Sequence, residues 1–582
     1  MRMKIYGTLL AAVLSACVSV AYAQNLDPTV EVNRSYESKL MEVHKPLLEM
    51  AVPDSVLRFD LDFDYEVFEN PYKGAYEFKP YVMDLQPDGR TVGHNNLYLR
   101  LGAGNGFEAL SLRPTADFVW SPVFRERFKM DVYANHRSYV GEYGKADLPD
   151  PAAEKAVLKL RRSYGRTDYD MLTRAGVDGR YDWTGGTVRA DVGYYGIAER
   201  FGDSGNLYNA LDVKAGVASK DYGQFMNYDV HASYRFGSDR QSYRGVSESF
   251  DEHEFDVLGK LKAVLMENHK AMFELGVENH SYADAGVTRL TFAPHYMLKY
   301  GRWDFNVGFR VEPLLPSKDT VCFQTKGQVI YPDITVDYQL IPERMKAYAK
   351  IGGGTKVNSF SSLLAQNHHF DLNYAHGGPL MDNTVENISA VLGVEGRLGA
   401  RFAYGLRGGY AMYGNAPIET VTVGTLPGDR EQIYLPGITY AGYQNVYVTA
   451  DVNWAVERFR VDGSVTYRNA WYEDIETPGY FLPAAVTGSL ALEYNWHKRI
   501  FLGMDCDFST GRQKGSVLFP DGTSQSASVP GYADLGIDFE YLANRNFSVW
   551  VRGGNLLNMS IQRNLLYAEK GVYFAAGICL NL

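Results

Sequence analysis

The sequence predicts an all-β protein, a transmembrane antiparallel β-barrel of the outer-membrane type. The chain of 582 residues is 14% aromatic and 46% hydrophobic, which excludes a disordered chain. After the first segment, no apolar run reaches the roughly 18 residues that a membrane-spanning helix needs. From about residue 97 to residue 582, segments of 9 to 13 residues alternate apolar with polar residues and end in turns. Strands are therefore the elements available to cross a membrane.

Residues 1–23 are predicted to be a secretory signal peptide. Residues 1–4 form a positive start, residues 5–16 are apolar, and Ala21-Tyr22-Ala23 matches a cleavage site. The residues before Cys17 also resemble a lipobox, so lipid attachment at Cys17 stays open as an alternative. Either reading predicts that the chain is exported.

Net charge and cysteine content exclude several kinds of partner and site. The formal net charge of −11, without a basic stripe, argues against nucleic acid. Beyond Cys17 the cysteines are Cys322, Cys506 and Cys579, an odd and widely spaced set. We therefore expect no disulfide framework, no cysteine metal site and no cofactor.

Strand length favours a membrane barrel over a soluble sandwich. In residues 572–582 the even positions are Val, Phe, Ala, Ile, Leu and Leu, whereas the odd positions include Tyr, Gly, Cys and Asn. Sandwich strands run about 5 to 6 residues, whereas a tilted strand needs about 9 to 11 to cross a bilayer. The segments match the longer figure.

A sheet in hydrocarbon must close, because every backbone N–H and C=O needs a partner there. The candidate segments give about 22 strands, with 18 or 20 as alternatives. Within residues 149–166, residues 154–162 also fit a short helix in an external loop, which would change the count of strands. We assign residues 94–582 to the barrel.

The face of these strands opposite the apolar one carries many charges and is predicted to line the lumen. Carboxylates outnumber arginines there, which favours cations if water fills the lumen, whereas cross-strand ion pairing is the structural alternative. The lumen-facing candidates are Asp304, Asp451, Asp462, Glu493, Asp534, Asp538, Glu540, Arg310, Arg460, Arg468 and Arg552.

The C-terminal tail carries a more specific pattern, a G-x-N-L-x-N turn followed by an aromatic, a Gly and the final strand. Its residues are Gly554, Asn555, Leu556, Asn558, Gly571, Phe574 and Gly577. This tail resembles the closing hairpin of TonB-dependent receptor barrels from Bacteroidetes-type bacteria, and the start of the barrel resembles plug-less relatives of those receptors. The resemblance implies a receptor-like barrel. Energy-coupled import is not carried over, because residues 24–93 are too few for a plug domain.

Residues 24–93 are expected to fill the lumen or to present a periplasmic docking strand. In this segment residues 61–68 alternate acidic with apolar side chains, and aromatic residues and prolines follow. A barrel of about 22 strands has a lumen too wide for its own side chains to fill, so something must block it. A solvated leader is the alternative.

Two further clusters are considered as sites. His368, His369 and His376 with Asp371 have the chemistry of metal ligands but no familiar spacing, so solvated loop histidines are expected. His280 and Ser281 are adjacent on a strand and face opposite sides, so this pair does not form a nucleophile and base. We expect no enzyme activity.

The predicted protein is an integral outer-membrane barrel that binds or passes a solute. The alternative is a non-transporting scaffold subunit of an outer-membrane assembly. Outer-membrane lipid and lipopolysaccharide are the expected surroundings, and candidate protein partners are outer-membrane proteins and lipoproteins.

Overall fold

The structure is a computed structural model that describes residues 96–582. Short segments within that range are not described: 107–111, 142–143, 147–155, 158–159, 163–167, 202–203, 221–224, 244–245, 318–321, 369–380, 426–431, 473–479, 520 and 570. The predicted signal peptide with Cys17 and the segment 24–93 lie outside the described residues. So do His369, Asp371 and His376.

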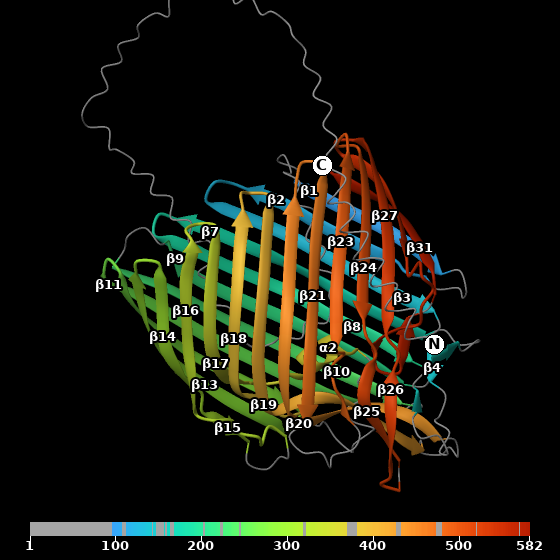
Figure 1. Ribbon diagram of the computed structural model, residues 1–582. Coiled ribbons are helices and arrows are strands. Elements are labelled where there is room, and N and C mark those ends of the chain that lie inside the picture. Colours follow the sequence, from blue (N-terminus) through green and yellow to red (C-terminus); the bar gives the residue numbers. More distant parts are fainter. Residues whose placement is uncertain are drawn as a thin grey trace, which may run out of the picture. The chain divides into compact units, whose positions relative to one another are not determined.

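Twenty-two strands form the barrel wall (Figure 1). In order around the wall they are β1 (Leu97–Gly106), β2 (Thr115–Phe124), β3 (Phe128–Gly141), β7 (Asp168–Trp183), β8 (Gly186–Phe201), β9 (Ser204–Ser219), β10 (Met226–Tyr243), β11 (Val246–Met266), β12 (His269–Tyr282), β13 (Ala285–Tyr300), β14 (Trp303–Val311), β16 (Ile330–Ile341), β17 (Met345–Lys356), β18 (Thr384–Leu398), β19 (Phe402–Thr425), β20 (Gln432–Ala455), β21 (Phe459–Tyr472), β23 (Val486–Trp496), β24 (Ile500–Ser509), β27 (Tyr532–Asn544), β28 (Phe547–Gly554) and β31 (Tyr573–Asn581).

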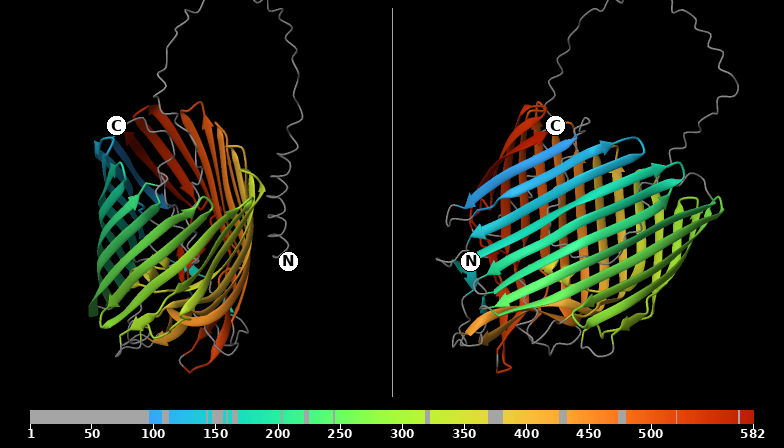
Figure 2. Two further views of the ribbon diagram at one scale, coloured as in Figure 1. Left: turned by 90° about the vertical axis from the view of Figure 1, so that its left-hand side faces the viewer. Right: turned by 180° about the vertical axis from the view of Figure 1, so that it is seen from behind.

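The wall is closed, because its first and last strands pair with each other. β1 runs antiparallel to β31, with Tyr98 opposite Asn581 and Gly106 opposite Tyr573. Every neighbouring pair around the wall is antiparallel, and views from two further sides show the closed wall (Figure 2). The predicted fold class and the predicted count of 22 strands are confirmed. No helix among the described residues is long and apolar enough to span a membrane.

Alternation of side chains gives each wall strand a lipid face and a lumen face. In β27 the outward side chains of Ile537, Phe539 and Tyr541 are exposed, whereas Glu540 between them is buried. Exposed apolar residues recur in this way on most strands of the wall. This belt is what a barrel in hydrocarbon requires.

Aromatic side chains on the lumen face lie over glycines of neighbouring strands. Trp550 of β28 covers Gly577 of β31 and Gly102 of β1, where a Cβ atom on either glycine would collide with its ring. Tyr447 of β20 covers Gly409 of β19 in the same way. Glycine is used at these positions because another side chain approaches the backbone closely.

The longest loops lie at the end of the barrel away from the C-terminus, whereas most connections at the C-terminal end are short turns (Figure 1). The loop end also has three short connections, between β8 and β9, β10 and β11, and β12 and β13. Short turns are periplasmic and longer loops extracellular in outer-membrane barrels. The extracellular loops contain β4 (Gly144–Ala146), β5 (Ala156–Val157), β6 (Leu160–Arg162), β15 (Leu314–Pro316), α2 (Phe360–Gln366), β22 (Tyr480–Phe481), β25 (Arg512–Leu518), β26 (Ser524–Val529), β29 (Ile561–Asn564) and β30 (Tyr567–Glu569).

The helical alternative for residues 154–162 does not fit the described part of that segment. β5 pairs in parallel with β26, and β6 pairs with β4. The physical reason is that β4 of the same loop and β26 of another loop offer strand edges, and pairing with an edge outweighs the weak helix preference of a short segment.

Candidate functional site at the extracellular mouth

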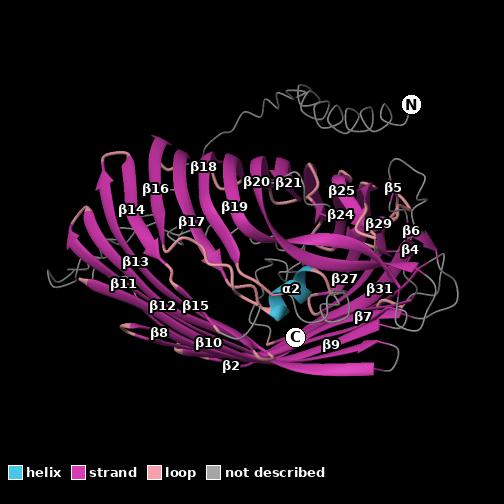
Figure 3. Ribbon diagram, turned by 90° about the horizontal axis from the view of Figure 1, so that it is seen from below, coloured by secondary structure: helices cyan, strands magenta, loops and turns pink. Residues whose placement is uncertain are grey.

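The loop between β17 and β18 enters the barrel. Its helix α2 lies inside the ring of strands when the barrel is viewed from below (Figure 3). We call residues 357–368 the α2 segment. The helix starts where it does because Ser359 has an extended backbone and its Oγ accepts a hydrogen bond from the Ser362 N–H at 3.2 Å.

Apolar contacts hold the α2 segment against the far wall. The side chains of Phe360, Leu363 and Leu364 are fully buried in a cluster that includes residues of β8, β9, β12, β13 and β20. The Phe360 ring lies 5.9 Å from the ring of Tyr208 and 4.8 Å from that of Tyr282, measured between centroids. Six strands of the wall, β10 to β14 and β16, lie between β9, which carries Tyr208, and β17, where the loop starts, so the α2 segment extends through the lumen to reach β9.

Glu252 of β11 receives the first N–H groups of the helix. Its Oε1 accepts a hydrogen bond from the Phe360 N–H at 2.6 Å, and the Ser361 N–H lies 3.3 Å from both carboxylate oxygens. The Tyr208 hydroxyl donates to Oε2 at 2.7 Å. Glu252 is only 1% exposed. These donors compensate for burying the carboxylate and satisfy helix groups that have no partner within the helix.

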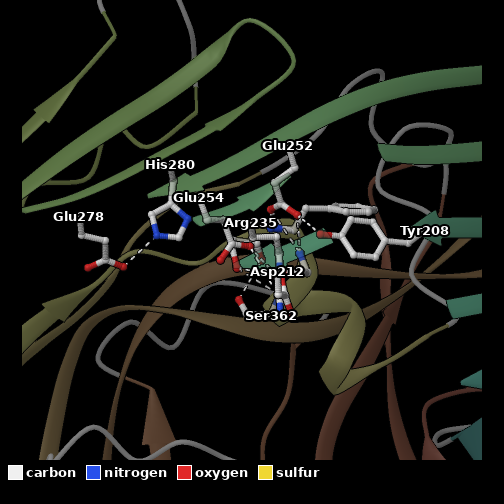
Figure 4. Close-up of polar contacts among 11 residues, drawn as sticks. Tyr208, Asp212, Arg235, Glu252, Glu254, Glu278, His280 and Ser362 are labelled. Carbon is white, nitrogen blue, oxygen red and sulfur yellow. Dashed lines mark hydrogen bonds and ion pairs between the residues drawn. The ribbon is translucent and has the colours of Figure 1, made fainter. Parts of the chain in front are cut away.

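Arg235 of β10 makes the second polar contact with the helix. Its Nε and Nη2 donate to the two oxygens of Asp212 at 2.5 and 2.8 Å, the bidentate geometry of a strong arginine–carboxylate pair. Its Nη1 donates to Ser361 Oγ at 2.9 Å, and that hydroxyl donates to Glu254 (Figure 4). The pair fixes the guanidinium, which in turn orients the start of α2.

Beside the contacts of Glu252 and Arg235 with the helix, a further series of charged groups extends along the wall. His280 Nε2 lies 2.8 Å from Glu278 Oε1 (Figure 4). Arg289 also pairs with Glu278. Arg289 also lies 3.5 Å from Glu312, which accepts the Thr355 N–H at 2.8 Å. His280 thus serves an ion-pair network that ends at β17.

His368 anchors the other end of the α2 segment. Its Nδ1 lies 2.8 Å from Asp170 Oδ1 of β7, and its backbone oxygen accepts a hydrogen bond from Asn206 Nδ2 of β9 at 3.2 Å. Burial opposes the charged imidazolium, but the carboxylate of Asp170 outweighs burial and raises the pKa of His368. We expected a solvated loop histidine here, and the structure instead shows a tertiary contact.

The two ends of the loop are tied to each other by buried amides. Asn358 Nδ2 donates to the Asp382 backbone oxygen at 2.7 Å, and Asn383 Nδ2 donates to the Phe323 backbone oxygen at 3.1 Å. Asn415 Nδ2 donates to the Asn383 backbone oxygen at 2.7 Å. These hydrogen bonds therefore hold the first and last residues of the loop next to each other.

Three of the four arginines among the predicted lumen residues lie close to carboxylates. Arg310 lies 3.0 Å from Asp333, Arg460 lies 2.6 Å from Asp462, and Arg552 lies 2.9 Å from Asp505. In the cross-strand register, Arg460 is opposite Glu493 and Arg468 is opposite Tyr447.

The carboxylates among these residues have polar neighbours as well. Asp451 accepts from Ser464 Oγ at 2.7 Å, Glu540 accepts from Ser548 Oγ at 2.6 Å, and Asp534 lies 2.5 Å from Arg563. Asp538 is opposite Arg552, and Asp304 is opposite Asp337. Among the described residues, no group of three or more His, Cys, Asp or Glu is arranged to hold a metal ion.

The tail motif folds into the loop that precedes the last strand. Asn555 and Asn558 have φ of 46° and 50°, a conformation that asparagine tolerates better than most residues. The Asn555 side chain donates to the Met559 backbone oxygen at 2.7 Å and accepts the Met559 N–H at 3.0 Å. Its own N–H donates to Asp534 at 3.1 Å.

The other motif residues have different surroundings. The Leu556 N–H donates to the Leu535 backbone oxygen at 2.9 Å, and Gly571 has φ of 39°. Phe574 is 43% exposed on the outer face. Gly554 lies under the ring of Tyr573, as Gly577 lies under Trp550.

The sequence did not predict that the α2 segment binds the inner wall of the barrel. His368 of the α2 segment and His280 of the adjoining ion-pair network drew attention, both for other reasons. The sequence does contain a signal for this helix. Ser359 is a typical N-cap residue, and Phe360 and Leu363-Leu364 follow it at the spacing of an apolar helical face within a long loop.

Comparisons with known proteins show the fold. No family model matches the chain, and neither does any curated protein. Among solved structures, it is similar to a mutant ferric enterobactin receptor from Pseudomonas aeruginosa, with 10% identity, a TM-score of 0.55 and coverage of 84% of this chain and 80% of that one. It is also similar to the copper transporter OprC (10% identity, TM-score 0.57, coverage 84% and 81%) and to the FrpB iron transporter from Neisseria meningitidis (10%, 0.58, 83% and 81%).

The closed wall and the exposed apolar belt together indicate the location. A closed barrel of this size, with such a belt, is an integral protein of the outer membrane, as the sequence predicts.

Proposed function

We propose that this chain binds or passes a solute across the outer membrane, and that the α2 segment narrows its lumen. One observation carries the proposal: the α2 segment starts at β17 and binds β7, β9, β10 and β11 across the ring. The likeness to barrels of receptors and transporters supports solute passage further.

The test is conductance in planar bilayers. Leu363→Asp places a charge in the buried cluster beneath α2 and should displace the α2 segment, so we expect conductance several-fold above that of the unmodified protein. Leu398→Asp, at a side chain 62% exposed beside a periplasmic turn, is the matched control and should leave conductance unchanged.

Heat-modifiable migration on gels must first show that both variants are folded barrels. Unchanged conductance in a folded Leu363→Asp variant would contradict the proposal. Purification from native membranes in mild detergent tests the scaffold alternative, which predicts stoichiometric protein partners.

A further inference from the structure

The two ends of the α2 segment are held by different chemistry. At the start, backbone N–H groups and the Tyr208 hydroxyl donate to Glu252, and these donors keep their protons near neutral pH. At the end, the contact joins the imidazole of His368 to the carboxylate of Asp170. Histidine changes its charge between about pH 5 and 8.

The surroundings of His368 favour its charged form. Asp170 and Arg174 face it from β7, and Glu199 faces it from β8, so two carboxylates oppose one arginine. From β9 the amide of Asn206 donates to the His368 backbone oxygen. In the cross-strand register Asp170 and Glu199 are directly opposite each other, which places both carboxylates at the level of the imidazole.

We propose that the α2 segment is a pH-responsive strap, which acidic medium outside the cell holds against β7 and alkaline medium releases at its His368 end. The inference rests on the proposed role of this segment in narrowing the lumen. His368 and Asp170 lie in the extracellular half of the barrel and are each about a quarter exposed, so protons of the medium reach them.

The direction of the pH effect follows from the linkage between proton binding and docking of the α2 segment. The pKa of docked His368 is raised above the ordinary value of about 6.5, so docking binds a proton more tightly than release does. The extra stability of docking is complete below about pH 6.5 and is lost as pH rises through the raised pKa. Each pH unit by which that pKa is raised corresponds to about a tenfold change in the docking equilibrium.

The experiment measures hydrogen-exchange protection of residues 360–367 in the full-length protein in lipid nanodiscs, at about pH 5.5 and pH 8.5. Protection factors correct for the intrinsic pH dependence of exchange. We expect higher protection at the lower pH in the unmodified protein. His368→Gln and Asp170→Asn should lower protection at acidic pH and reduce its pH dependence, and what remains measures the carboxylate of Glu252 at the other end of the helix. His368→Lys keeps the positive charge and should give similar protection at both values.

His253→Gln is the matched control, because that imidazole lies on the outer face and contacts the Tyr234 hydroxyl at 2.9 Å. It should retain the full pH response. Equal protection at both pH values in the unmodified protein, or an unaltered pH response in His368→Gln, would overturn the inference.

Single-channel conductance under the same conditions separates the two proposals. Conductance that rises with external pH, in step with lost protection, supports both. Protection that changes while conductance stays constant keeps the strap but removes its role in narrowing the lumen, which contradicts the proposed function.

Discussion

At the scale of single residues, the barrel seam depends on one tryptophan and two glycines. Trp550 fills the space above Gly102 of β1 and Gly577 of β31, the two strands that close the wall. Its ring also lies 4.6 Å from the guanidinium of Arg100. A side chain that fills a glycine notch leaves no room for an added methyl group.

Gly102→Ala should therefore destabilise the barrel by about 1 to 3 kcal/mol, the usual range for overpacking. The measurement is the temperature at which the folded band disappears in a heat-modifiability series. Gly179→Ala, where the nearest atom to an added Cβ is 3.7 Å away, is the control and should cost much less.

A double variant tests the cause. Trp550→Ala alone should also destabilise, because it leaves a void on the lumen face. Gly102→Ala together with Trp550→Ala should cost less than the sum of the two single changes, because the collision is gone. Strict additivity would show that Trp550 is not what limits the size of residue 102.

At the scale of elements, Asn555 organises the loop that joins β28 to β31, the last strand of the wall. This residue combines a positive φ with two side-chain hydrogen bonds to Met559, and its N–H is bonded to Asp534. The cluster formed by β19, β22, β25, β26 and residues 565–567 packs the same loop against its neighbours. The local conformation at Asn555 and the packing of residues 565–567 therefore favour the same arrangement of this loop.

Substitutions at Asn555 should separate backbone conformation from hydrogen bonding. Asn555→Gly accepts the positive φ and loses only the side-chain bonds, at about 1 kcal/mol each. Asn555→Ala loses the same bonds and adds roughly 1 kcal/mol of strain. We expect thermal stability to fall in the order Asn, Gly, Ala at residue 555. Equal losses of stability in the Gly and Ala variants would show that the positive φ is not costly.

At the scale of the whole molecule, the two faces of the wall should respond oppositely to charge. Val465 and Ser464 are neighbours on β21, the first 44% exposed on the lipid face and the second bonded to Asp451 in the lumen. Val465→Arg should cost about 2 to 4 kcal/mol near the bilayer midplane. Ser464→Arg should cost little, because the new guanidinium meets Asp451 and water.

Folding into phospholipid vesicles, followed by urea titration, measures both variants. A larger loss for Ser464→Arg than for Val465→Arg would reverse the assignment of the faces. Comparable losses in detergent alone would not bear on it, so the bilayer is the required medium.

The sequence by itself determined the class of the barrel, because its cause is local. Alternation with a period of two places successive side chains on opposite faces, and a length near ten residues matches the bilayer. Both properties are readable along residues 572–582 without knowledge of any partner. Closure followed from the need to pair every backbone group, and the count of 22 strands followed from the number of such segments.

Tertiary structure alone decided what occupies the lumen and which charges meet. Phe360 and Glu252 are 108 residues apart in the chain, and His368 and Asp170 are 198 apart. The sequence showed that acidic side chains share a face, but strand register selects the partner of each, as for Arg552 and Asp505. Contacts between distant segments depend on how the wall curves and where a loop turns inward, and no local periodicity encodes either.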